Sequence, residues 1–133
     1  MYKIISSTHL DFSYKESILI SLSNQAKTLK NLDPMVPFAF SYFDEENNFI
    51  DGIEGYDIYG GLYIDLLFVA DKFRKSKYGS KLANRAVELA IQRGCSFVHL
   101  STMDFKARPF YEKLGFEVEY MREGYHQNSI MYY

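Results

Sequence analysis

The chain has 133 residues, and residues 1–133 suit a single domain with one hydrophobic core. Apolar residues make up 47% of it, which excludes a disordered chain, and the net charge of −2 argues against a general nucleic-acid-binding surface. A single cysteine, Cys95, excludes a disulfide framework, and without a long apolar run or signal-peptide core we expect a cytoplasmic protein with no membrane span.

The first predicted elements are a strand and a helix. Residues 2–7 (YKIISS) are short and rich in β-branched side chains, a pattern typical of a strand. Residues 16–32 carry apolar residues at helical spacing, and Asp33 followed by Pro34 ends this predicted helix. The apolar residues that share one face of the helix are Ile18, Leu22, Ala26 and Leu29.

Three more strands and a second helix follow. Residues 38–43 (FAFSYF) and 48–59 predict two strands joined by the turn DEENN, so that they form a hairpin. Residues 61–69 are almost continuously apolar, as expected of a strand buried on both faces. Residues 79–93 predict a helix that ends at Gly94.

The last third of the chain predicts three shorter elements and a closing strand. Residues 96–101 (SFVHLS) predict another buried strand, and residues 106–114 predict a short helix that ends at Gly115. Residues 116–121 and 128–133 predict a hairpin. A strand–helix–strand unit requires a parallel pair with a right-handed crossover, whereas hairpins are antiparallel. The sequence therefore predicts a mixed α/β sheet with helices on both faces.

A basic loop, RKSKYGSKL at residues 74–82, connects the predicted strand 61–69 to the predicted helix 79–93. Backbone amides at the start of a helix bind phosphates, and such loops usually carry several glycines that allow close approach. This loop has only Gly79. Taken alone, the loop favours an ordinary solvated turn over a phosphate site.

The motifs on either side of this loop favour a phosphate site over a solvated turn. The stretches LLFVADKFRKSKYGSKL and CSFVHLSTMDFKARPFYEKLGFEVE resemble the GNAT superfamily of acetyl-CoA-dependent N-acetyltransferases, and the resemblance covers almost the whole chain. The motif FKARPFYEKLGF is similar to the corresponding motif in a branch of small bacterial GNAT proteins. The resemblance implies a mixed, mostly antiparallel sheet with a splayed parallel strand pair, acetyl-CoA as the cofactor, and a homodimer.

The resemblance also implies where the cofactor binds. The strand splays at its end, which frees backbone groups for the pantetheine amides, and the basic loop takes the pyrophosphate. Lys75 and Lys77 stand where the family carries glycines, and a left-handed Lys77 would cost about 1–2 kcal/mol, which two ammonium groups can offset. Asp104 replaces a frequent asparagine. The implied cofactor-binding residues are Leu67, Phe68, Val69, Arg74, Lys75, Ser76, Lys77, Tyr78, Gly79, Ser80, Asp104, Phe110 and Tyr111.

Acetyl transfer to an amine needs a deprotonated amine, a polarised carbonyl and a protonated leaving group. Tyr111 matches the tyrosine that serves the family as general acid, although a helix tyrosine can also be packing. Asp65, an acid in an apolar strand, is a candidate base or else makes a structural hydrogen bond. His99 is the next candidate base or else a satisfied core histidine.

The acceptor side is less defined by the sequence. Tyr63 and His126 are the predicted substrate-binding residues, in a cleft that also contains Tyr56 and Tyr59, although His126 can equally be a turn residue. The histidines and Cys95 have no metal-ligand spacing, so we predict no metal, and Cys95 is interpreted as packing.

The predicted function is transfer of acetyl from acetyl-CoA to a primary amine of a small molecule or peptide, by direct attack in a ternary complex. A first alternative is a non-catalytic acyl-CoA-binding or sensing protein with the same fold, motivated by Lys75, Lys77 and Asp104. A second is an interaction module that has lost the cofactor.

Overall fold

The structure is a computed structural model that describes residues 2–68 and 78–133. The predicted cofactor residues Val69, Arg74, Lys75, Ser76 and Lys77 lie outside the described residues. The chain forms two compact units, residues 1–35 and residues 36–133. The expectation of one domain over the whole chain stays a prediction.

The first unit contains helix α1 (Phe12–Lys30) and the segments before and after it. Asp11 caps the helix by accepting a hydrogen bond from the Ser13 amide, and Asn31 ends it in the left-handed conformation, with φ 54°. The predicted helix is therefore confirmed. The predicted strand at residues 2–7 is wrong, because a strand must pair its backbone groups and the described part of this unit contains no second strand.

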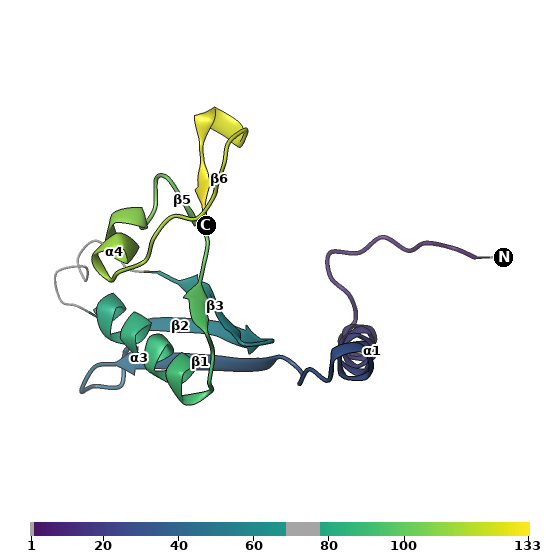
Figure 1. The fold of residues 1–133 in the computed structure, drawn as a ribbon. Helices are drawn as coiled ribbons and strands as arrows, with labels where there is room; N and C mark the ends of the chain where they lie inside the picture. The colour runs from purple at the N-terminus through teal and green to yellow at the C-terminus, as the bar shows by residue number, and fades with distance from the viewer. Residues whose placement is uncertain (1, 69–77) are drawn as a thin grey trace. The chain divides into compact units, whose positions relative to one another are not determined.

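The second unit is built on a four-stranded sheet in the order β1-β2-β3-β4 (Figure 1). Strands β1 (Val36–Phe43), β2 (Phe49–Ile58) and β3 (Gly61–Leu67) pair antiparallel, and β4 (Phe97–His99) pairs parallel with β3. Helix α3 (Tyr78–Gln92) follows β3 in the chain and precedes β4. The predicted mixed α/β fold, with its hairpin and its parallel pair, is confirmed.

The rest of the chain forms short elements. Strands β5 (Thr102–Met103), β6 (Met121–Arg122) and β7 (Met131–Tyr132) make a second sheet in the order β5-β7-β6. Helix α4 (Arg108–Lys113) and the 3₁₀ turn η1 (His126–Asn128) lie between them in sequence. The closing hairpin is confirmed but its strands are shorter than predicted, because the ladder pairs only Met121 and Arg122 with Tyr132 and Met131.

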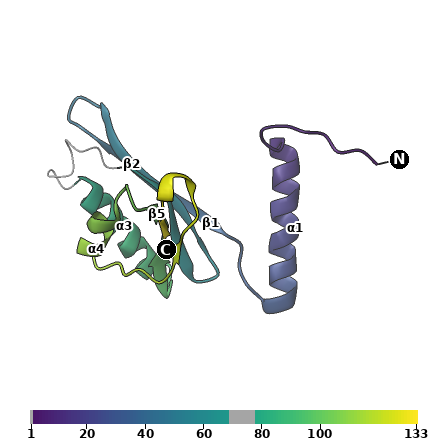
Figure 2. The ribbon, with the colours of Figure 1, turned by 90° about the horizontal axis from the view of Figure 1, so that it is seen from above.

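One face of the four-stranded sheet packs on α3 and α4, which lie on the same side of it (Figures 1 and 2). Leu62 and Ile64 of β3, Leu82 and Ala86 of α3 and Tyr111 of α4 belong to one buried cluster. We call this face the inner face and the opposite one the outer face. Among the described residues, no helix is long and apolar enough to cross a membrane.

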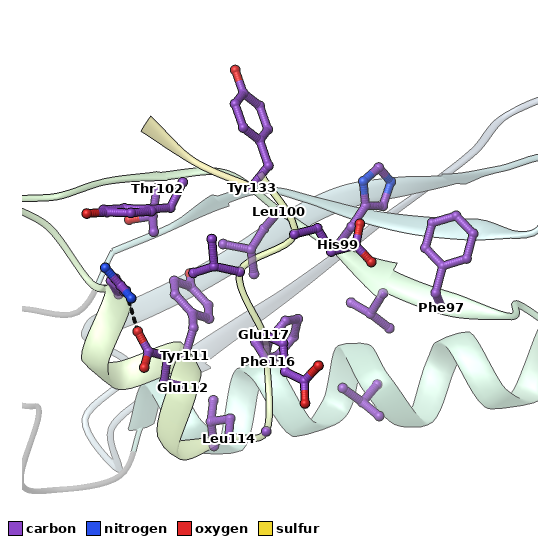
Figure 3. Close-up of a pocket in the computed structure, with 17 residues that line it drawn as sticks. Phe97, His99, Leu100, Thr102, Tyr111, Glu112, Leu114, Phe116, Glu117 and Tyr133 are labelled. Atoms are coloured by element: carbon purple, nitrogen blue, oxygen red, sulfur yellow. Dashed lines mark hydrogen bonds and ion pairs between the residues drawn. The ribbon is translucent and has the colours of Figure 1, made fainter. Parts of the chain in front are cut away.

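The predicted buried strand at residues 96–101 is only partly correct. Leu100 is buried, but Phe97 and His99 are exposed. The reason is that β4 is the last strand of its sheet and its alternate side chains point to the outer face. In Figure 3, Phe97 and His99 accordingly point away from α3.

Candidate active site

The parallel pair separates where a cofactor cleft is predicted. Strand β3 pairs with β4 only as far as Tyr63 and His99, although β3 continues to Leu67. Beyond that point the chain that follows β4 enters β5, which pairs with β7 instead. The side of β3 that faces β5 therefore has backbone N–H and C=O groups outside the parallel ladder, from Ile64 onwards.

A β-bulge lies at the same place. Glu54 pairs with Leu66 and Gly55 pairs with Ile64, so Asp65 has no direct partner in β2. A bulge bends its strand and redirects a side chain, and bulges often occur beside functional sites. Here the bulge leaves the Asp65 side chain exposed at the beginning of the separation.

The space between the separated strands is a cleft of about 470 Å³. Leu67 and Phe68 line it from β3 and the residue after β3, and Tyr111 lines it from α4. Asp65 and Ser101 also line it. The structure thus brings together four predicted site residues, Asp65, Leu67, Phe68 and Tyr111. Free backbone groups along an apolar cleft suit an extended chain that contains amides, such as pantetheine.

Tyr111 is the most deeply buried of the predicted catalytic residues, with 7% of its surface exposed. Its ring makes edge contacts with Phe110, at 5.0 Å between ring centroids, and with Phe116, at 5.6 Å. Burial raises the pKa of Tyr111 to about 12, and the negative charge of Asp51 adds to the effect. The phenol is therefore protonated at neutral pH and can donate a hydrogen bond or a proton.

Asp51, on the inner face of β2, was not predicted. Only 6% of it is exposed; its Oδ1 accepts a hydrogen bond from the Gly52 amide at 2.7 Å, and its Oδ2 has no partner. Burial raises the pKa of this carboxyl, and the hydrogen bond from Gly52 opposes the rise. By contrast Asp57, on the same face, binds Arg93 at 2.7 Å.

A second cavity, of about 570 Å³, lies on another side of Tyr111 (Figure 3). It is larger than the cleft and is lined by Leu100, His99, Phe116 and the ion pair between Arg108 and Glu112. The cleft is smaller, but it is the cleft that contains the free edge of β3 and Asp65.

The other predicted residues are more dispersed. Gly79 and Ser80 lie in the first turn of α3, where Gly79 is buried. The Tyr78 ring lies 4.8 Å from the Tyr42 ring, and Lys81 lies over the same Tyr42 ring at 5.8 Å. The start of α3 is therefore held against β1.

Asp104 has a structural partner. Its Oδ1 accepts a hydrogen bond from the Ile130 amide at 3.2 Å, and its own amide donates to the Ile130 carbonyl at 2.8 Å. The carboxylate thus joins the end of β5 to the start of β7. His126 is exposed in η1, beside a shallow depression that it shares with Tyr125.

Cys95 is half-buried against the core, as expected for packing. Burial raises the pKa of its thiol, which keeps it protonated. The described residues contain no cluster of three or more histidine, cysteine or acidic side chains that could hold a metal ion.

Comparison with known proteins identifies the family. The model of the Acetyltransferase (GNAT) family matches residues 6–116. The chain belongs to this family. Acetyltransferase Atu2258 of Agrobacterium fabrum (strain C58 / ATCC 33970) is 32% identical over 97 residues, which cover 63% of this chain and 71% of that protein. Its similarity supports an acyltransferase enzyme.

Two solved structures show that the fold is shared. An acetyltransferase from Bacillus cereus ATCC 14579 superposes with a TM-score of 0.77 at 24% identity, covering 98% of this chain and 94% of that one. An aminoglycoside 6'-N-acetyltransferase complexed with coenzyme A has a TM-score of 0.60 at 20% identity, covering 72% and 71%. The resemblance predicted from the sequence motifs is confirmed.

Proposed function

We propose that this protein transfers an acetyl group from acetyl-CoA to a primary amine of a small molecule or peptide, with both bound at once. The observation that carries the proposal is the cleft between β3 and β5, which is lined by both Asp65 and Tyr111 in a chain of the GNAT family. When bound, acetyl-CoA supplies a thioester whose C–S bond is exchanged for a C–N bond, while the amine loses one proton and the sulfur gains one.

The residues of the cleft fit an extended cofactor arm. Leu67 and Phe68 lie where β3 has left the parallel ladder, so their backbone groups can bond the amides of the arm. Apolar side chains of the cleft exclude water from the reacting carbonyl. The first turn of α3 contains Gly79 and Ser80, and the positive end of the helix dipole there favours an anion.

Tyr111 is placed to donate a hydrogen bond to the departing sulfur. Its pKa of about 12 keeps Oη protonated over the physiological range. Phenol-to-thiolate transfer is uphill at that value, so we assign Tyr111 to a hydrogen bond that strengthens as negative charge develops on the sulfur.

Asp65 is the better of the two candidate bases. Its carboxylate is exposed and lines the same cleft as Tyr111, so it can take a proton from the amine directly or through one water molecule. His99 does not line this cleft; its ring packs 5.0 Å from the Tyr63 ring. We therefore assign the base to Asp65 and a place beside the acceptor to His99.

The proposal is tested by thiol release from acetyl-CoA over a panel of amines that includes monoamines, diamines, amino sugars and peptides, with mass spectrometry of the products. We expect at least one amine to be acetylated at nitrogen. Calorimetry with acetyl-CoA separates the failures. Binding without transfer to any amine would favour the non-catalytic acyl-CoA-binding alternative, and no binding would favour the interaction module.

A further inference from the structure

Four aromatic rings form a continuous row on the outer face of the sheet. The Tyr56 and Tyr63 ring centroids are 5.5 Å apart, Tyr63 and His99 are 5.0 Å apart, and His99 and Phe97 are 5.3 Å apart. The row crosses β2, β3 and β4, because Tyr56 is paired with Tyr63 and Tyr63 with His99. We call these four residues the aromatic row.

A glycine makes room for the last ring. A side chain at Gly61 would place its Cβ 2.7 Å from Cζ of Phe97, a distance at which one of them must move. Because Gly61 has no side chain, the Phe97 ring can lie over β3 and beside His99. The absence of a side chain at Gly61 of β3 thus makes room for the last ring of the row.

The aromatic row is not part of the hydrophobic core. None of its members belongs to the buried cluster, which lies on the inner face. Phe97 is 57% exposed, His99 is exposed, and Tyr56 and Tyr63 are half-buried. Four adjacent rings with free surface indicate a binding surface more than a packing requirement.

Other rings in the protein already hold a cation from the chain. The Arg85 guanidinium lies 4.9 Å from the centroid of Phe40, and that of Arg108 lies 4.3 Å from the centroid of Tyr132. Among residues 2–68 and 78–133, no lysine or arginine lies over a ring of the aromatic row. The described part of the chain therefore leaves the electron-rich faces of these rings to a cation from outside.

Tyr63, inside the row, lies beside the proposed reaction cleft. The Tyr63 hydroxyl lies 3.3 Å from Oγ of Ser101, and Ser101 lines the cleft together with Asp65. Two exposed carboxylates lie close to the row in sequence. Asp65 lies two residues after Tyr63, and Glu54 lies two residues before Tyr56. Rings and carboxylates together make a surface that attracts positive charge.

We propose that the aromatic row is a subsite for an organic ammonium group of the acceptor, separate from the amine that is acetylated. This inference rests on the proposed function, since it places the acceptor at the outer end of the cleft. The acceptor class it names is a molecule with at least two amino groups, or an amine that also carries a quaternary ammonium. One nitrogen reacts at Asp65, and the charged one binds the rings.

The test uses two probes of equal shape that differ in charge. Choline carries a trimethylammonium group, and 3,3-dimethylbutan-1-ol carries a neutral tert-butyl group in its place. Both are titrated into the coenzyme A complex of the full chain and followed by NMR. We expect choline to bind about two- to tenfold more tightly, as a cation on aromatic rings should. Equal affinities would overturn the inference.

Substitutions within the aromatic row test whether the preference for choline arises there. Tyr63→Leu and Phe97→Leu should remove most of the preference for choline, whereas Tyr63→Phe should keep it, because phenylalanine retains the ring. Phe43→Leu is the matched control, since Phe43 is 52% exposed on β1 and outside the row. The melting temperature checks that each variant is folded. A preference that survives in both Tyr63→Leu and Phe97→Leu would place the cation elsewhere and refute the proposal.

The two proposals fail separately. Neither probe has an amine to acetylate, and the experiment uses coenzyme A without an acetyl group. If both probes bind equally while amines are acetylated, the aromatic subsite is wrong and the acetyltransferase function stands. If choline is preferred but no amine is acetylated, the proposed function is wrong, and the aromatic row stands only as a binding site for an organic ammonium ion.

Discussion

The two faces of the four-stranded sheet carry different chemistry on the same strands. On the inner face, β2 contributes Asp51 and Ile53, which are buried. On the outer face, neighbouring positions contribute Glu54 and Tyr56, which keep contact with solvent. Because side chains alternate along a strand, one step in sequence changes the environment from core to surface.

The difference is clearest in two aspartates. Asp51 is buried with one unpartnered oxygen, so its charge is costly and acts on the neighbouring Tyr111. Asp65 lies in the bulge of β3, is exposed and lines the cleft. A carboxylate in contact with water can exchange protons with a substrate, whereas a buried one mainly sets the field around its neighbours. Four predictions follow this contrast.

The largest effect is expected at Tyr111, on the inner side of the cleft. Tyr111→Phe removes one hydroxyl and keeps the ring contacts with Phe110 and Phe116. We expect kcat to fall by about 10²–10³-fold, the usual cost of removing one preorganised hydrogen-bond donor, with little change in the calorimetric affinity for acetyl-CoA. An unchanged kcat would remove Tyr111 from this role.

Alanine substitutions at two glycines compare the inner and outer faces of the sheet, because each adds one methyl group to a different face. At Gly55, which faces inward, a Cβ would lie 1.9 Å from the Tyr63 carbonyl oxygen. Backbone cannot yield easily, so Gly55→Ala should lower the free energy of unfolding by about 3 kcal/mol in urea. At Gly61 the Cβ would meet only the exposed Phe97 ring, which can rotate away. A loss for Gly61→Ala as large as that for Gly55→Ala would contradict this view of the outer face.

Much of the architecture could be predicted because the pattern of side chains determines it. The hairpin, the parallel pair and helices α1, α3 and α4 follow from spacing, turn residues and glycine caps. The meeting of Leu67 and Tyr111 in one cleft followed from the family motifs. By contrast, residues 2–7 have strand composition but form no strand, and the described part of the first unit contains none, because composition does not supply a pairing partner.

Asp51 could not be found from the sequence for a related reason. The stretch FIDGIEGYDI carries Asp51, Glu54 and Asp57 without strict alternation of apolar and polar residues, so it does not show which acids face inward. Asp57 forms an ion pair with Arg93, which is remote in sequence, whereas Oδ2 of Asp51 has no hydrogen-bond partner. Such pairing depends on tertiary contacts. The exposure of Asp65 likewise depends on a bulge that its apolar neighbours did not indicate.

The third prediction isolates Asp65. Asp65→Asn keeps the shape of the side chain but removes its basicity, so we expect kcat/KM to fall by about 100-fold at neutral pH. Glu45→Gln is the matched control, because it removes the same charge from an exposed position in the turn between β1 and β2. That control should change kcat/KM by no more than about twofold, since exposed charges are screened. Equal losses in both variants would show a general electrostatic effect and would exclude Asp65 as the base.

The smallest expected effect is the pH dependence of stability that Asp51 causes, and its direction follows from the raised pKa of this carboxyl. Because burial raises its pKa in the folded state, the folded protein binds this proton more tightly than the unfolded chain does. The stabilisation is present below the ordinary aspartate pKa and is lost as pH rises through the raised value. Asp51→Asn removes this dependence, so its stability relative to wild type should increase by about 1–2 kcal/mol from pH 4 to pH 8 in urea unfolding.

Asp44, in the turn of the same hairpin, supplies a control of opposite sign. It accepts hydrogen bonds from the Glu46 and Asn48 amides at 2.8 and 2.9 Å. The bonds from Asn48 are the main cause of its lowered pKa. Its contribution is present above the ordinary aspartate pKa and is lost as pH falls, so Asp44→Asn should lose stability relative to wild type as pH rises from 3 to 6. If the two variants shift in the same direction with pH, burial does not distinguish Asp51 from a surface acid, and the contrast between the two environments fails at its most direct test.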